Sequence, residues 1–211
     1  MKMPHQWTAE EFQRDRDLAT SYFREARGKE PLEIYGGFFE TYQGFMEELL
    51  EQTVDLTHLD EAIVDLMGDE DKQYIVRYLS GPPVSADDLK TMLGTSSLAG
   101  SKFATEPELA TRLVAFIRDW HDRRRFPWLS EQWEPGEDDR RTAIIATAAM
   151  IAMQKTQTAR RSEGSTAQEM RVVNVLESAG MTLVPARTIS TLQDAPAPGE
   201  FCRESMYGGR K

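Results

Sequence analysis

A run of three arginines, Arg123–Arg125, stands between aromatic residues in the middle of the chain. Trp120 precedes this run, and Phe126 and Trp128 follow it. Guanidinium groups bind phosphate oxygens and aromatic rings stack on bases, so the segment could grip a nucleic-acid backbone. A solvated helix end with aromatic anchors would give the same pattern, and the sequence leaves both interpretations open.

Further candidates lie nearer the C-terminus. Lys155, Arg160 and Arg161 come at the expected end of a long helix, where they could contact phosphates or interact with the negative end of the helix dipole. Glu169 falls on the helix that precedes two expected strands, and its carboxylate could point toward the ends of those strands. A glutamate on a solvated helix surface is the simpler alternative.

The remaining reactive groups form no recognisable site. The acidic runs 69–71 and 87–88 fit helix starts, where negative charge is favoured, better than they fit a metal site. Three scattered histidines and one cysteine, Cys202, cannot build a Cys/His zinc site. Nucleophile-elbow motifs and glycine-rich phosphate loops are absent from the sequence. The motifs therefore show no complete active site, and no metal ligands are predicted.

Charge is unevenly distributed along the chain, whose formal net charge is −10. Residues 1–100 carry 9 Lys and Arg against 20 Asp and Glu, whereas residues 140–211 carry 10 against 6. The total disfavours a nucleic-acid partner, but the basic C-terminal part is compatible with binding a polyanion. Two solvated faces of different sign would explain the same counts.

Helix signals fill the first part of the chain. Thr8 and Glu11 predict a capping box that begins one helix, and Pro31 predicts the start of a second helix, which Gly36-Gly37 weakens. Shorter helices are expected over the ranges 59–66, 72–79, 85–93 and 105–120. These elements predict a mainly α-helical N-terminal region.

A long helix is expected from about residue 138 to residue 161, and its apolar middle, residues 143–153, predicts central burial. Gly164-Ser165 should interrupt this helix, after which a final helix begins and runs to Gly180. The β-branched ranges 181–185 and 188–192 predict two strands. Two strands alone do not make a stable sheet, so they should pair with something outside this chain, or the chain should be the front of a longer protein.

Nothing in the sequence predicts a membrane or secreted protein. No apolar run approaches the ~18 residues that a membrane-spanning helix needs, and the first residues lack the features of a signal peptide. A single cysteine excludes an intramolecular disulfide, which suits a reducing compartment. We therefore expect a cytoplasmic location.

Eight short segments occur in an order that resembles the XamI family of type II restriction endonucleases. The resemblance covers essentially the whole chain, and residues 187–211 are its most distinctive part. The segments are Glu30-Pro31-Leu32, Val54-Asp55-Leu56-Thr57, Gly81-Pro82-Pro83-Val84-Ser85, Asp87-Asp88-Leu89-Lys90, Asp122–Trp128, Ala159-Arg160-Arg161, Pro185–Leu192 and Ala195–Cys202.

The resemblance implies the PD-(D/E)XK class of nucleases, in which a helix precedes a mixed sheet whose acids and lysine hold Mg²⁺ for phosphodiester hydrolysis. In the family pattern the first acid follows an Arg-Lys pair that matches Arg210-Lys211, where this sequence ends. The expected fold is therefore mainly α, with a helical region over 1–162 and an incomplete, truncated nuclease core over 163–211. Glu169 is the one candidate catalytic acid, and we expect that this chain alone does not cleave DNA.

The same resemblance implies double-stranded DNA as substrate, a possible homodimer, and a cognate DNA methyltransferase encoded nearby. A non-catalytic helical module that binds DNA or another protein is the alternative function. The residues expected to contact DNA are Arg123, Arg124, Arg125, Lys155, Arg160, Arg161, Arg187, Arg210 and Lys211.

Overall fold

A computed structural model of the chain describes residues 6–203 and 206–207. These residues fall into two compact units, and the chain passes from the first to the second between residues 156 and 157. The expected division at residues 162 and 163 falls inside a helix, and its functional meaning stays a prediction. Within the described residues, no helix has both the length and the apolar character that crossing a membrane requires.

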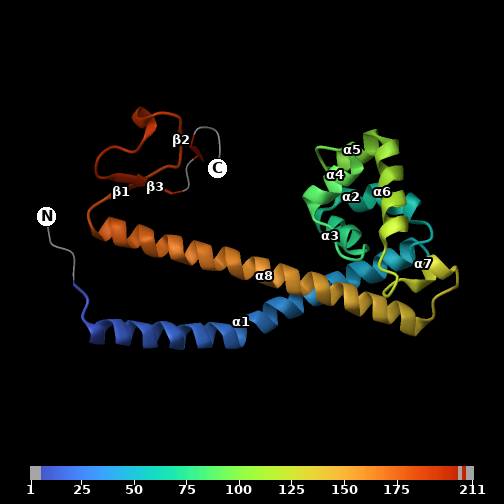
Figure 1. Cartoon of the computed structure of the whole chain (residues 1–211), viewed down its shortest axis with the longest axis horizontal. Coiled ribbons are helices and arrows are strands. Elements are labelled where there is room, and N and C mark those ends of the chain that lie inside the picture. Colours follow the sequence, from blue (N-terminus) through green and yellow to red (C-terminus); the bar gives the residue numbers. More distant parts are fainter. Residues whose placement is uncertain (1–5, 204–205, 208–211) are drawn as a thin grey trace. The chain divides into compact units, whose positions relative to one another are not determined.

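The first unit is helical, as the sequence predicts (Figure 1). Its elements are α1 (Ala9–Gln52), α2 (Leu59–Gly68), α3 (Glu70–Tyr78), α4 (Ala86–Leu93), α5 (Gly100–Thr105), α6 (Pro107–Trp120), α7 (Pro127–Glu131) and the first part of α8 (Glu137–Ser178).

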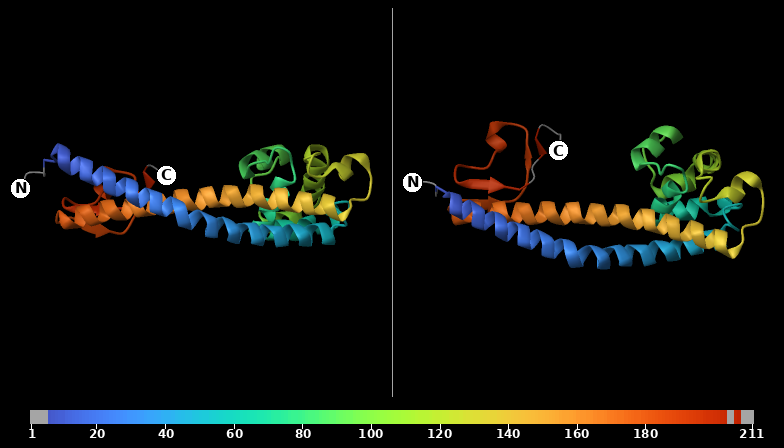
Figure 2. Two further views of the ribbon diagram at one scale, coloured as in Figure 1. Left: turned by 90° about the horizontal axis from the view of Figure 1, so that it is seen from below. Right: turned by 60° about the horizontal axis from the view of Figure 1, so that its bottom comes forward.

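Helix α1 begins at the predicted capping box, in which the backbone N–H of Glu11 donates to Thr8 and the Thr8 N–H donates to the Glu11 carboxylate. The second helix expected at Pro31 was wrong, because α1 continues through this position and bends along its length (Figure 2). Proline removes only one hydrogen bond from a helix and can be accommodated as a bend.

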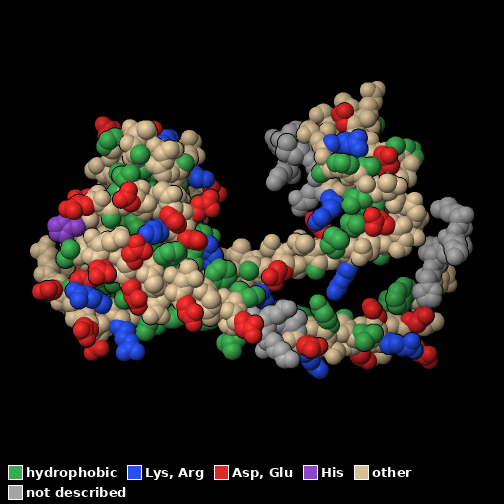
Figure 3. All heavy atoms as spheres, turned by 180° about the vertical axis from the view of Figure 1, so that it is seen from behind, with side chains coloured by type: hydrophobic (Ala, Val, Ile, Leu, Met, Phe, Trp, Pro, Cys, Tyr) green, Lys and Arg blue, Asp and Glu red, His purple; other side chains and the backbone are tan. Residues whose placement is uncertain are grey.

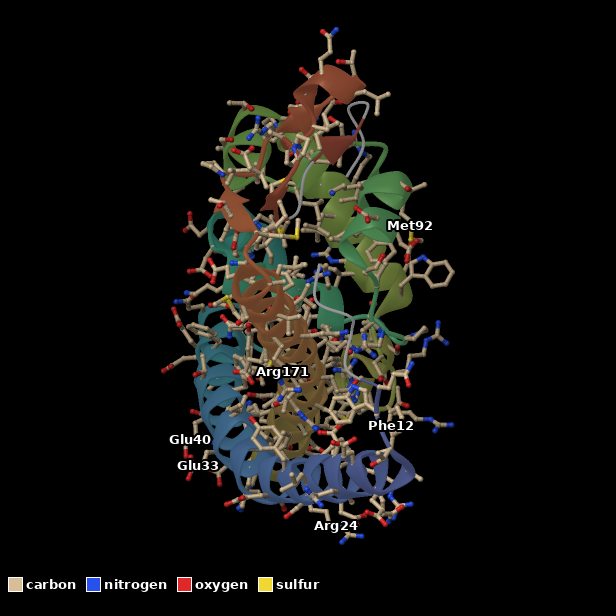
Figure 4. The ribbon with its side chains drawn as sticks, turned by 90° about the vertical axis from the view of Figure 1, so that its left-hand side faces the viewer. Phe12, Arg24, Glu33, Glu40, Met92 and Arg171 are labelled. Atoms are coloured by element: carbon tan, nitrogen blue, oxygen red, sulfur yellow. The ribbon has the colours of Figure 1, made fainter. Side chains whose placement is uncertain are left out.

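The two parts of α1 differ in burial. The C-terminal part buries one stripe, Tyr42, Met46, Leu49 and Leu50, in the core that α2, α3 and α6 share. In the N-terminal part Phe12 is 60% exposed, and Figure 4 shows Phe12 and Arg24 pointing outward from the helix. The apolar pattern of α1 therefore predicts its core contacts only in the C-terminal part.

The short helices follow local signals closely. Ser85 accepts a hydrogen bond from the backbone N–H of Asp88 at the start of α4, and Gly94 ends that helix in the left-handed conformation. Such a conformation is cheap for glycine, which has no Cβ. Pro107 occupies the first turn of α6, where its missing N–H has no helical partner to lose.

Helix α8 is one continuous element, so the predicted interruption at Gly164-Ser165 was wrong. A glycine inside a helix costs only about 1 kcal/mol relative to alanine, which neighbouring turns can offset. The expected central burial of residues 143–153 holds on one face only. Ala143, Ala148 and Ile151 are buried, whereas Met153 is 56% exposed.

The second unit follows α8 with two small parallel sheets. In one sheet β1 (Thr182–Val184) pairs with β3 (Glu200–Cys202), and in the other β2 (Thr188–Ile189) pairs with β4 (Met206–Tyr207). A short 3₁₀ turn, η1 (Leu192–Asp194), lies between β2 and β3 in the sequence. The expected strands thus find partners within the chain, which corrects the first of the two alternatives, pairing with something outside it. Neither β3 nor β4 was predicted, because these two segments contain no β-branched residue.

Candidate functional site

The predicted acid Glu169 lies in a groove of the second unit. Residues of α8 form one wall of this groove and residues of β3, together with the one that follows it, form the other. The groove has a volume of about 380 Å³ and a mainly apolar floor. Its lining residues are Ser165, Gln168, Glu169, Val172, Val173, Leu176, Phe201, Cys202 and Arg203.

Glu169 does not stand alone in the groove. A guanidinium N–H of Arg203 donates to the Glu169 carboxylate. The Glu169 side chain is 33% exposed and the Arg203 side chain is 42% exposed. The pair joins α8 to the end of β3, 34 residues later in the chain. Sequence reasoning missed Arg203 because it did not predict β3, so nothing indicated that this arginine returns to the helix.

The groove alone does not fit a magnesium ion. Mg²⁺ prefers several hard oxygen ligands in octahedral geometry, and Glu169 is the only carboxylate among the lining residues. Its charge is already met by Arg203. Across the part of the chain that the structure describes, no three His, Cys, Asp or Glu side chains come together as a metal site would require.

The arginine run 123–125 divides into two roles. Arg123 and Arg124 are exposed, whereas the Arg125 side chain is only 7% exposed. Arg125 donates to Asp122 at 2.9 Å, to the Thr147 hydroxyl at 2.9 Å and to the Ser80 carbonyl at 3.0 Å. Its guanidinium group is therefore used inside the fold, which leaves it unsuited to contact a DNA phosphate.

Asp122 is the partner that makes this arrangement stable. Burial opposes ionisation of its carboxyl, but hydrogen bonds from Arg125 and from the backbone N–H of Arg124 outweigh that effect and hold its pKa below the usual range. The run thus presents Arg123 and Arg124 on a turn that Asp122 and Arg125 fix from within. The aromatic neighbours divide as well, since Phe126 and Trp128 are buried and Trp120 is 55% exposed.

Lys155, also predicted to contact DNA, is engaged inside the first unit. Its Nζ lies 3.0 Å from Asp71 Oδ1 and 4.1 Å from the centre of the Tyr74 ring. Tyr42 donates its hydroxyl to the same Asp71 oxygen at 2.5 Å. Lys155 therefore fastens α8 to α1 and α3, and only 22% of its side chain is exposed.

The other predicted contacts lie in the second unit. Arg161 and Arg187 are exposed, on α8 and on the loop between β1 and β2, and Arg160 is half-buried on α8. Arg210 and Lys211 lie outside the described residues. Around the helices α2 to α7, Asp and Glu side chains are interspersed with Lys and Arg on the face shown in Figure 3.

Comparisons with known proteins agree with the resemblance seen in the sequence. The family model described as XamI restriction endonuclease matches residues 57–211. The type II restriction enzyme XamI of Xanthomonas campestris pv. amaranthicola is 31% identical over 215 residues, which cover 99% of this chain and 76% of that enzyme. No solved structure matches the chain.

Proposed function

This chain belongs to the XamI restriction endonuclease family, and from that premise we propose that it serves a type II restriction enzyme that cuts double-stranded DNA at a specific sequence. The observation that carries the proposal is the family match, which spans 57–211 and includes most of the first unit and all of the second. A nuclease of this kind is a hydrolase whose substrate is the DNA phosphodiester bond.

We assign the DNA contacts to the exposed arginines. Arg123 and Arg124 extend from the turn after α6, and Arg161 and Arg187 extend from the second unit. Each is a flexible cation that can pair with a phosphate and release a counterion, which favours binding at low salt. Half-buried Arg160 belongs to the same stretch of α8, and Arg210 and Lys211 stay predictions from the sequence.

We assign Glu169 as the acid that this chain contributes to the catalytic centre. Arg203 neutralises it in the groove, so the carboxylate must exchange that partner before it can serve any reaction. Magnesium is the cofactor expected for the class, but a Mg²⁺ site needs more oxygen ligands than this groove supplies. The 211-residue chain should therefore bind DNA without cutting it.

The partners follow from the same proposal. An enzyme that cuts a symmetric site is commonly a symmetric dimer, so a homodimer is expected. The host must protect its own copies of the site, which calls for a DNA methyltransferase encoded nearby. Both proteins would act where the chromosome is, in the cytoplasm.

The test uses the purified chain and a long plasmid duplex that samples many sequences. The fluorescence anisotropy of the chain, measured over a series of salt concentrations, should show DNA binding that weakens as the salt concentration rises. Incubation of the chain and the plasmid with MgCl₂ should leave the plasmid intact. Absence of duplex affinity even at low salt would contradict the DNA role and favour the alternative, a helical protein-interaction module. Cleavage that EDTA abolishes would contradict the conclusion that this chain supplies too few oxygen ligands to hold Mg²⁺ and cut DNA.

A further inference from the structure

A strained turn links α1 to α2 in the first unit. Val54, Asp55 and Leu56 have φ angles of +47°, +57° and +70°, so three consecutive residues with side chains adopt the left-handed conformation. This conformation costs about 1–2 kcal/mol for an ordinary residue and is especially unfavourable for a β-branched one such as valine. It persists only where surrounding contacts over-determine it.

Three contacts to Asp55 hold this turn. The Asp55 N–H donates to the Leu50 carbonyl at 2.8 Å, and its own carbonyl accepts from Trp128 Nε1 at 2.9 Å. Its carboxylate, buried in the fold, accepts from Arg140 Nε at 2.8 Å and from Arg140 Nη2 at 2.6 Å. Two distant elements, α7 and α8, therefore fix the turn through one residue.

The turn forms part of the wall of a cleft of about 660 Å³. Among the described residues, four non-glycine residues have a positive φ angle: the three of the turn and Gln132, at +55°. All four line this cleft. Strain of this kind tends to collect at ligand sites, where it pre-organises the groups that meet the ligand. The charged groups of the lining are Asp55, Glu134, Arg118 and Arg140, which balance one another.

The chemistry of the lining selects a flat and neutral ligand. Trp133 is 38% exposed and forms a T-shaped pair with Trp128 at 6.3 Å between ring centres, so part of its aromatic surface is open on this lining. Arg140 is held by Asp55 through Nε and Nη2, and within the described residues its Nη1 makes no hydrogen bond. The exposed carboxylate of Glu134 is an acceptor on the same lining. A balanced charge gives no preference for a free phosphate.

Guanine is the base that matches this set. Its O6 and N7 are both acceptors, which suit an arginine donor, and its N1–H and amino group are both donors, which suit a carboxylate. Adenine places a donor where guanine has O6 and an acceptor where guanine has N1–H, so it would meet Arg140 and Glu134 with the wrong groups. Stacking on Trp133 would add affinity that does not depend on the base.

We propose that the cleft between the turn 54–56, α7 and the start of α8 is a binding site for one guanine base, with Arg140 and Glu134 reading its edges and Trp133 stacking on its face. The base could come from a free nucleotide or from an unstacked position of DNA. A guanine from DNA as the ligand rests on the proposed function, whereas guanine binding in the cleft does not.

The indole N–H signals of the four tryptophans give a direct readout in a ¹H–¹⁵N NMR titration. Trp133→Phe and Trp120→Phe variants assign the two relevant signals. Addition of deoxyguanosine monophosphate should move the Trp133 signal to saturation and shift the signal of exposed Trp120, which does not line the cleft, much less. Deoxyadenosine monophosphate should bind at least about fivefold more weakly, the low end of discrimination by a good base contact.

A Glu134→Gln variant keeps the size of a residue that is exposed on a loop, so folding is not at risk. This variant should lose most of the preference for guanine over adenine while both nucleotides still reach Trp133. Equal affinity for the two nucleotides in the unchanged protein, or an unmoved Trp133 signal, would overturn the guanine site.

A second titration uses a duplex that carries one unpaired guanine, whose N1–H and amino group are not bonded to cytosine, and follows the same signals, with anisotropy as the measure of binding. Duplex binding with a shift of Trp133 supports the guanine site as a DNA contact. Duplex binding without that shift overturns this part of the proposal and leaves the DNA role intact. A guanine-selective nucleotide site in a chain without duplex affinity supports the cleft and contradicts the DNA role.

Discussion

Gly68 and Gly100 meet where α2 packs against α5. A Cβ placed on Gly100 would stand 2.5 Å from the Cα of Gly68 and 2.8 Å from the carbonyl oxygen of Met67. Backbone atoms cannot move aside as a flexible side chain can, so no residue larger than glycine fits between the two helices. Gly68 is exposed and Gly100 is half-buried, so the contact lies at the edge of the core, beside the buried Met67.

The first prediction follows from this contact. Gly100→Ala should destabilise the protein by about 1–3 kcal/mol, because an overpacked site must push backbone apart. Gly36→Ala is the matched control, since that glycine lies within α1 with nothing within 4 Å of an added Cβ. This control should stabilise the protein by about 0.5–1 kcal/mol through better helix propensity. Urea unfolding measures both, and a stable Gly100→Ala variant would contradict the packing.

Sequence signals gave the helix boundaries where the cause is local. The capping box at Thr8, the cap at Ser85 and the left-handed Gly94 each depend on residues within four positions of one another. The predicted breaks at Pro31 and Gly164-Ser165 failed because a long helix forms cooperatively and can tolerate one proline, at about 3 kcal/mol, or one glycine, at about 1 kcal/mol.

The side-chain partnerships were beyond the sequence, because they join distant positions. Arg125 reaches Ser80, 45 residues earlier, and Arg140 reaches Asp55, 85 residues earlier. From spacing alone, Arg123 and Arg125 are equivalent members of one basic run. The fold separates them, since one is exposed and the other is buried. A basic run therefore predicts candidates for DNA contact but cannot say which of its members the core uses.

The second prediction tests that separation by stability. Arg125→Met should cost about 2–4 kcal/mol, because the Ser80 carbonyl and Asp122 would lose a buried donor. Arg124→Met, with the same change at an exposed position, should alter stability by less than about 0.5 kcal/mol. Thermal unfolding monitored by circular dichroism compares the two variants. Equal stability would show that the buried hydrogen bonds of Arg125 contribute little.

The third prediction concerns the exposed pair Arg123 and Arg124. The double variant Arg123→Ala/Arg124→Ala should fold normally and should lower the salt dependence of duplex binding by about two in the slope of log K against log salt. This value follows from about 0.9 of a counterion released for each phosphate contact. Anisotropy titrations at several salt concentrations provide the slope. An unchanged slope would remove this turn from the proposed DNA interface.

The fourth prediction addresses the ion pair in the groove of the second unit. Glu169→Gln removes the negative charge that Arg203 meets, so duplex affinity should rise a few-fold at low salt. Glu177→Gln removes the same charge from an exposed position of α8 that does not line the groove. This control variant should gain less affinity. Equal gains in both variants would mean that only net charge matters and that the groove is not near the DNA.

The fifth prediction is a pH dependence centred on Asp71. Hydrogen bonds from Tyr42 and then from Lys155 hold the pKa of the Asp71 carboxyl below its usual range. A group whose pKa is lower in the folded state stabilises the fold fully above its unfolded pKa, which is about 3.9 for aspartate. That contribution then disappears as the pH falls through the folded pKa.

Asp71→Asn should therefore be less stable than the unchanged chain at neutral pH, and the difference between them should shrink below about pH 4. Taking the difference in stability between the two proteins cancels the contribution of the other carboxyls that titrate in this range. Asp87→Asn is the control, because the Asp87 side chain is 92% exposed and its pair with Lys90 should contribute little at any pH. Urea unfolding between pH 7 and pH 3 gives the differences. A difference in stability that stays constant across this range would mean that the contacts of Asp71 do not depend on its charge. Lys155 would then hold α8 chiefly through the rings of Tyr42 and Tyr74.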